Sequence, residues 1–90
     1  MVAFDGFKEG VLIEAKGPGY AQFLKADGSG WQEFFTGWEP MRRQLERQVS
    51  AAAGTPVQWH VAEEGVARFI RKYVTDQGLP VEVIWTAATP

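Results

Sequence analysis

The segment VAFDGFKEGVLIEAKGPGYAQF, residues 2–23, decides the fold of this 90-residue chain, because it predicts a β-hairpin at the start of a sheet. Residues 2–7 and 11–16 form two short runs typical of strands, and Lys8-Glu9-Gly10 between them is typical of a tight turn. The Gly-Pro-Gly sequence at 17–19 ends the second run.

The register of this hairpin predicts which side chains meet. With a two-residue turn at 9–10, Asp5 lies directly opposite Glu14, and opposed side chains on one face have Cβ atoms about 5 Å apart. Lys16 shares that face because side-chain direction repeats every two residues along a strand. We expect the other face to join the core, and its members are Phe4, Val11, Ile13 and Ala15.

The opposed carboxylates of Asp5 and Glu14 indicate metal-dependent phosphodiester chemistry. Two such groups repel each other, and a divalent cation between them removes the repulsion. Oxygen ligands suit magnesium or manganese, and Lys16 would then orient an attacking water or stabilise charge on a phosphate. The alternative interpretation is a solvated hairpin face with a salt bridge between Glu14 and Lys16, since short acid–lysine patterns arise often by chance.

The rest of the chain predicts one mixed sheet with flanking helices. A short helix is expected over 20–24, and a stretch at 31–35 is ambiguous between strand and loop. Apolar residues with helical spacing predict long helices from about 40 to 53 and from about 63 to 77, with strands at 55–62 and 80–86. The order strand–strand–helix–strand–helix–strand is typical of an α+β or α/β fold.

Composition limits the function classes that need consideration. Ninety residues, of which 46% are hydrophobic, suit a single domain spanning residues 1–90. The chain has no cysteine, which excludes a disulfide scaffold and any thiolate metal site. The net charge of −2 means that nucleic-acid binding would need local basic patches. No apolar run reaches membrane-spanning length, and strand residues directly after Met1 favour a domain cut from a longer polypeptide.

Several residues of the first long helix are candidates for the same site. Gln44 and Gln48 are four apart and therefore share a helix face. Arg47, with Arg42 and Arg43 of the same helix and Lys25 of the loop at 25–30, could contact phosphates. A boundary glutamine pair and a solvated basic helix face are the alternatives.

Three further residues have weaker functional interpretations. His60, the only histidine, alternates with the apolar residues of its strand, and it would reach a phosphate if it shared the Asp5–Glu14 face. Gly17 would keep the entrance of the site open to a nucleic-acid backbone, although a simple chain reversal explains it as well. Tyr20 would stack on a base, or join the core beside the short helix. The four tryptophans are best interpreted as packing residues.

Several motifs together resemble one protein family. Asp5 followed by Glu14-Ala15-Lys16 is similar to the PD-(D/E)xK nuclease signature, in which an acid and an acid–x–lysine lie on adjacent strands. More closely, "FDGF", "LIEAKGPGYAQF", "RQLERQVSAAAGTPVQWHVAE" and "VARFIRKYV" resemble the restriction-endonuclease-fold toxins, and among them the fifth Tox-REase group. The likeness runs from Phe4 to about Ile84.

The resemblance implies a restriction-endonuclease-like core and a metal-dependent deoxyribonuclease. Asp5, Glu14 and the backbone carbonyl of Ala15 would hold Mg²⁺ or Mn²⁺, and Lys16 would position the water that attacks the phosphate. A glutamine of the following helix, Gln48 or Gln44, would lie near that water. Two departures stand out: Phe4 replaces the usual proline, and the helix and strand that precede the aspartate strand in the general nuclease core are not in this chain. The edge beside residues 2–7 is therefore a candidate surface for pairing.

The resemblance also implies a biological setting. Family members are C-terminal toxin domains of secreted bacterial effectors, carried by secretion machinery such as the type VI system, and they act on DNA in the cytoplasm of a rival cell. Each is expected to have a cognate immunity protein. Two alternatives stay open: a binding module of the same fold that does not hydrolyse its partner, and a nuclease directed at RNA, because such a metal site does not distinguish sugars.

Overall fold

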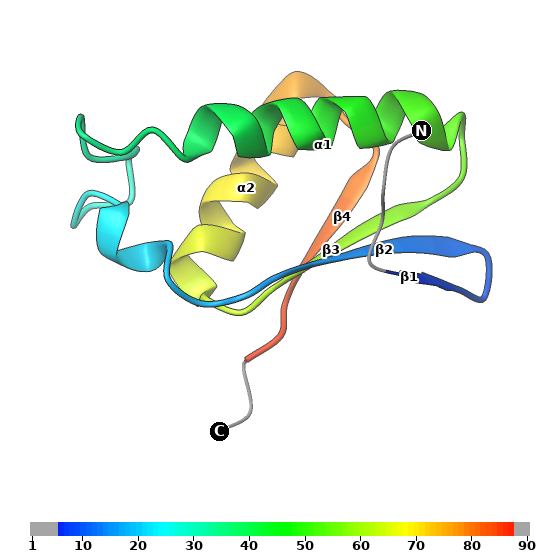
Figure 1. Ribbon diagram of the computed structural model, residues 1–90, viewed down its shortest axis with the longest axis horizontal. Helices are drawn as coiled ribbons and strands as arrows, with labels where there is room; N and C mark the ends of the chain where they lie inside the picture. The colour runs from blue at the N-terminus through cyan, green and yellow to red at the C-terminus, as the bar shows by residue number, and fades with distance from the viewer. Residues whose placement is uncertain (1–5, 88–90) are drawn as a thin grey trace.

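The computed structural model describes residues 6–87, and it shows a mixed four-stranded sheet with two long helices (Figure 1). The predicted α+β architecture is confirmed. In chain order the elements are β1 (Gly6–Lys8), β2 (Val11–Lys16), the 3₁₀ helix η1 (Ala21–Phe23), α1 (Trp38–Ala52), β3 (Val57–Val61), α2 (Glu64–Gln77) and β4 (Val81–Trp85).

The sheet has the spatial order β1-β2-β3-β4. β1 pairs antiparallel with β2, whereas β2, β3 and β4 run parallel to one another. Parallel neighbours need long crossover connections, and here α1 and α2 provide them. Figure 1 shows α1 lying lengthwise above the strands, and the loops around η1 lie near its start.

The hairpin turn has two residues, as the sequence predicts. Both have positive φ, 54° at Glu9 and 79° at Gly10, which matches the right-handed twist of the flanking strands. The resulting pairs are Lys8 with Val11, Phe7 with Leu12 and Gly6 with Ile13. Asp5, and with it the predicted Asp5–Glu14 pair, lies outside the described residues.

Both long helices cover the same face of the sheet. Their buried residues belong to one core with alternate residues of the two central parallel strands, and alternate residues of a strand point to one face. The core members are Met41, Leu45 and Ala52 of α1, Val66, Ala67, Ile70 and Val74 of α2, Val57, Trp59 and Val61 of β3, and Val83 of β4.

The expected orientation of β2 is wrong. We expected Val11, Ile13 and Ala15 to face the core, but Ala15 is exposed and Glu14 is buried. The parallel register pairs Leu12 with Val57 and Glu14 with Trp59, so the face of β2 that carries Glu14 is the face under the helices. Both faces of β2 carry apolar residues, so the pattern along this strand did not decide between them.

Stacked and edge-to-face aromatic contacts hold the long loop between β2 and α1. Trp31 lies 5.9 Å from Trp38 and 5.2 Å from Phe69, measured between ring centroids, and Phe23 stacks on Phe35 at 4.6 Å. The ambiguous stretch at 31–35 is a loop that makes one isolated bridge, between Leu24 and Trp31. These contacts fix the start of α1 against α2.

A polar link joins the two helices farther along. The Tyr73 hydroxyl of α2 donates a hydrogen bond of 2.7 Å to Glu46 of α1, and Arg42 lies 2.9 Å from the same carboxylate. The hydrogen bond from Tyr73, followed by contacts with Arg42, lowers the pKa of Glu46 below its ordinary value of 4.5. Burial and the bond to Glu46 raise the pKa of Tyr73.

This link predicts a specific pH dependence for Tyr73→Phe. A carboxyl whose pKa is lowered by folding stabilises the protein above its ordinary pKa, and this stabilisation is lost as the pH falls through 4.5 and below. Removing the hydroxyl returns the pKa of Glu46 toward its ordinary value. The melting temperatures of the wild type and of Tyr73→Phe, measured by circular dichroism, should therefore differ most at pH 7 and converge at about pH 3.

The matched control is Tyr20→Phe, because the Tyr20 hydroxyl makes no hydrogen bond within residues 6–87. The difference in melting temperature between Tyr20→Phe and the wild type should not change with pH in the acid range. A Tyr73→Phe difference that is equally large at pH 7 and pH 3 would contradict the link.

Candidate functional site

A buried carboxylate lies between β2 and α1. Glu14 is only 5% exposed, and both of its oxygens accept hydrogen bonds from amides of α1. Gln48 Nε2 donates to Oε1 at 3.0 Å, and Gln44 Nε2 donates to Oε2 at 3.0 Å. Lys16 Nζ lies 3.2 Å from Oε2. The four side chains form one polar group under the helix, which we call the Glu14 network.

Local structure explains why these residues meet. Glu14 and Lys16 are two apart on β2, so both point to the helix side of the sheet. Gln44 and Gln48 are four apart on α1, so both point down onto the sheet. The strand alternation and the helical repeat therefore bring a carboxylate, an ammonium and two amides together.

The hydrogen bonds fix the orientation of both amides. Lys16 Nζ donates to Gln44 Oε1 at 2.5 Å, which leaves the amide nitrogen of Gln44 facing Glu14. Trp59 Nε1 donates to Gln48 Oε1 at 2.8 Å, which leaves the nitrogen of Gln48 facing the same carboxylate. Lys16 Nζ also lies 5.1 Å from the centre of the Trp59 ring. Each amide thus links Glu14 to a separate donor.

The electrostatics of the network depend on the Glu14–Lys16 pair. A carboxylate removed from water is costly unless it is paired and hydrogen-bonded, and Glu14 has both kinds of partner. The Lys16 side chain is 14% exposed, so its ammonium lies at the boundary between the network and solvent. The arrangement presents one oriented cation beside one oriented carboxylate.

A second carboxylate holds the loop that follows β2. Oε1 of Glu63, at the start of α2, accepts hydrogen bonds from three successive backbone N–H groups. The donors are Gly19 at 3.1 Å, Tyr20 at 2.8 Å and Ala21 at 3.0 Å. This contact fastens the chain just beyond Lys16 to the junction between β3 and α2.

The structure brings together some of the predicted site residues. Gln44 and Gln48 join Glu14 and Lys16, although both amide atoms of Gln44, expected to contact nucleic acid, are engaged inside the network. Gly17 is exposed directly after Lys16, and Tyr20 is half-buried against the core. Arg47 is exposed on α1.

His60 does not join the network, which corrects our expectation for it. The register pairs His60 with Ala15, on the face of the sheet opposite Glu14 and Trp59. Its Nδ1 lies 3.0 Å from Thr86 Oγ1, and its Nε2 lies 3.1 Å from Gln58 Oε1. The alternation of apolar and polar side chains along this strand was predicted correctly. The condition that His60 shares the Glu14 face is not met.

Acidic neighbours compensate much of the predicted basic patch. Arg42 forms ion pairs with Glu39 and Glu46, and Arg43 lies 3.6 Å from Glu39. The hydrogen bond from Arg42 lowers the pKa of Glu39. These residues behave as the solvated helix face that the sequence left as an alternative.

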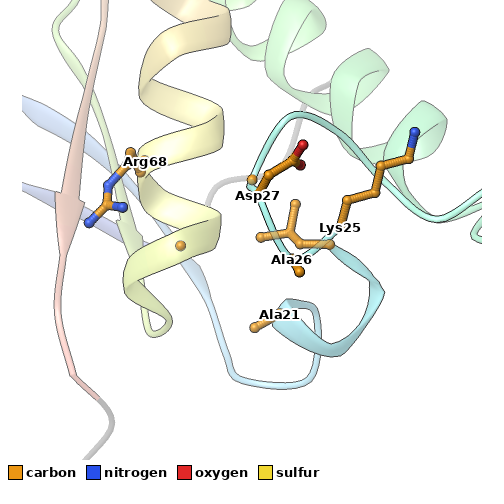
Figure 2. Close-up of a pocket in the computed structure, with 8 residues that line it drawn as sticks. Ala21, Lys25, Ala26, Asp27 and Arg68 are labelled. Carbon is orange, nitrogen blue, oxygen red and sulfur yellow. The ribbon is translucent and has the colours of Figure 1, made fainter.

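A separate cavity of about 330 Å³ lies between the loop at 25–28 and the start of α2 (Figure 2). Figure 2 shows the side chains of Lys25 and Arg68 pointing away from it on opposite sides. Asp27 accepts a hydrogen bond from the Ser29 N–H at 2.9 Å, and its bonds to Ser29 lower its pKa. Since charged groups do not converge here, the Glu14 network is the better candidate for a chemical site.

Trp59 is the site residue that the sequence analysis missed. The sequence indicated only a packing role for it, and Trp59 is indeed fully buried. The signal available was its position, because apolar alternation over 57–61 places it on the helix side of the sheet. That signal becomes informative only when the neighbouring strand is known to present Glu14 on the same face.

Comparison with known families identifies the chain. The family model described as restriction endonuclease fold toxin 5 matches residues 1–64, which include all of the Glu14 network. The chain belongs to this family. No curated protein and no solved structure matches the chain. Among the helices of residues 6–87, none is long and apolar enough to cross a membrane.

The network predicts that Glu14→Gln destabilises this toxin-family domain. The substituted amide places an NH₂ group against a donating NH₂ of α1, and Lys16 loses its counter-charge. We expect the free energy of unfolding to fall by about 1–3 kcal/mol, measured by urea denaturation. Glu9→Gln, at the exposed turn, should change it by less than about 0.5 kcal/mol. Equal stability of the two variants would contradict the buried network.

The Glu63 contact predicts that Glu63→Ala lowers the stability of the domain more than Glu64→Ala does. Glu63→Ala leaves three backbone N–H groups without their acceptor and should cost about 1 kcal/mol, because water replaces part of the interaction. Glu64→Ala removes only an exposed ion pair with Arg68 and should cost about 0–0.5 kcal/mol. Hydrogen exchange at the Tyr20 amide should accelerate in the Glu63 variant alone. Equal acceleration in both would argue against the contact.

Proposed function

We propose that the domain is a metal-dependent endonuclease toxin that cuts DNA phosphodiester bonds, with the Glu14 network as its hydrolytic centre. The observation that carries the proposal is the buried Glu14–Lys16 pair, oriented by two glutamines of α1 inside the region that matches the toxin family. A purely structural ion pair would be served as well by apolar residues of similar volume.

The described residues offer oxygen atoms, which are the ligands that magnesium and manganese ions prefer. Glu14 supplies carboxylate oxygens, which these hard cations prefer, and the backbone carbonyl of Ala15 is an expected second ligand. Residues 6–87 hold no cluster of three acidic or histidine side chains that would complete a site. Asp5, the third expected ligand, lies outside the described residues.

Glu14 and Lys16 would have different roles. A bound divalent ion would activate a water for attack on the phosphate and neutralise charge as it develops. Glu14 contributes the negative charge that binds the ion, and Gln44 and Gln48 hold its carboxylate still. Lys16 contributes a cation, already desolvated on one side, that stabilises the phosphate in the transition state. Its boundary position allows this cation to reach a substrate from solvent.

The substrate and biological setting follow from the family. We propose DNA as the substrate, delivery by a secretion system as part of a longer effector, action in the cytoplasm of a rival bacterium, and a cognate immunity protein as partner. Exposed Arg47, with Gly17 and Tyr20 beside the end of β2, would contact the sugar-phosphate backbone.

Cleavage assays test the proposal through Lys16→Met, which keeps the aliphatic stem beside Trp59 and removes the charge. Plasmid nicking with millimolar magnesium or manganese should fall about a hundredfold or more. Lys72→Met, which removes the same charge from the exposed surface of α2, should cut at the wild-type rate. Chelation with EDTA should stop all cleavage.

The alternatives are separated in the same assay. Cleavage of RNA but not of plasmid DNA would show that the substrate is RNA. A folded Lys16→Met variant that cuts at the wild-type rate would show that the Glu14 network is not the hydrolytic centre. A wild-type protein that binds DNA without cutting it in either metal would favour the binding module.

A further inference from the structure

Trp59 lies directly beneath the Glu14 network. It is 0% exposed and stands beside Glu14 in the parallel register of β2 and β3, so both side chains point toward α1. Core filling by itself requires a large apolar side chain at this position, not an indole N–H. The hydrogen bonds show a more specific use of this residue.

The indole N–H restricts Gln48 to one orientation. An indole nitrogen can donate but cannot accept, so only the amide oxygen of Gln48 can face it. That contact measures 2.8 Å, and it turns the amide nitrogen toward Glu14 Oε1 at 3.0 Å. The flipped amide would place its oxygen against the carboxylate and its nitrogen against the indole N–H, with two repulsive contacts.

Trp31 shows that burial of an indole does not guarantee such a contact. Its Nε1 is also buried, yet it has no hydrogen-bond partner within residues 6–87. Trp31 packs in the aromatic cluster near the start of α1, in contact with Phe35, Trp38 and Phe69. The two tryptophans therefore offer a matched comparison, because each can lose its N–H while keeping an aromatic ring.

We propose that Trp59 is a positioning residue of this site, which acts through Gln48 to hold the Glu14 carboxylate in place. The proposal rests on the proposed function for its effect on catalysis. The structural part of the proposal is the chain of contacts from Trp59 through Gln48 to Glu14, and it does not depend on the proposed function. The ring of Trp59, 5.1 Å from Lys16 Nζ, adds a contact with the lysine that phenylalanine would largely keep.

A double-mutant cycle on plasmid cleavage tests the catalytic part. Trp59→Phe and Gln48→Met should each lower kcat by about 10–100-fold, as loss of a partner of a metal-ligating group typically does, with little change in KM. Because Trp59 acts through Gln48, the double variant should match Gln48→Met within about twofold. Trp31→Phe should cleave at the wild-type rate. Effects of Trp59→Phe and Gln48→Met that multiply would overturn the proposal.

Nuclear magnetic resonance tests the structural part without any cleavage. Gln48→Met should shift one of the four tryptophan indole N–H signals, assigned to Trp59 by its absence in Trp59→Phe. Trp59→Phe should shift the side-chain carboxyl carbon of Glu14 in the same direction as Gln48→Met does, and Trp31→Phe should leave it unchanged. If Trp59→Phe does not fold, selective labelling assigns the indole signal, and its response to Gln48→Met decides the question.

The two experiments separate failure of this inference from failure of the proposed function. If the wild-type domain cuts neither DNA nor RNA, but the variants show the expected resonance shifts, the proposed nuclease function is wrong and the chain of contacts from Trp59 to Glu14 is supported. An indole signal of Trp59 that does not move in Gln48→Met overturns the inference, whatever the cleavage assay shows.

Discussion

The burial of the Glu14 carboxylate constrains the rest of this structure. A charged group that is 5% exposed needs an opposite charge and several hydrogen bonds to persist. Lys16 supplies the charge from the same strand, and Gln44 and Gln48 supply the hydrogen bonds from a helix about 30 residues away in the sequence. The position of α1 over β2 is therefore tied to the chemistry of the site.

Other interactions keep α1 in that position. The aromatic cluster around Trp31 and Trp38 fixes its start against α2, and the bond between Tyr73 and Glu46 fixes its middle. The contact of Glu63 with the loop after β2 holds the other side of the site. Together these contacts stabilise the packing of α1 on the sheet in this small domain.

The sequence predicted the features that depend on neighbouring residues. The turn at Glu9-Gly10, the span of β2 and the end of α2 at Gly78 follow from local conformational rules, and the spacing of Gln44 and Gln48 placed both on one helix face. The orientation of β2 was wrong because it depends on distant pairing: Val11 and Ile13 on one face, and Leu12 on the other, gave no clear apolar side. The roles of Trp59 and His60 depend on the register of β2 with β3, which no local pattern specifies.

We propose that the Glu14 network binds the divalent ion of a nuclease. The most direct measurement is anomalous scattering from a crystal of the whole domain soaked in manganese. We expect a peak about 2.1 Å from a Glu14 carboxylate oxygen, with Gln44 and Gln48 still in contact with that carboxylate. A peak at another acid, such as Asp27 or Asp76, with none at Glu14, would contradict it.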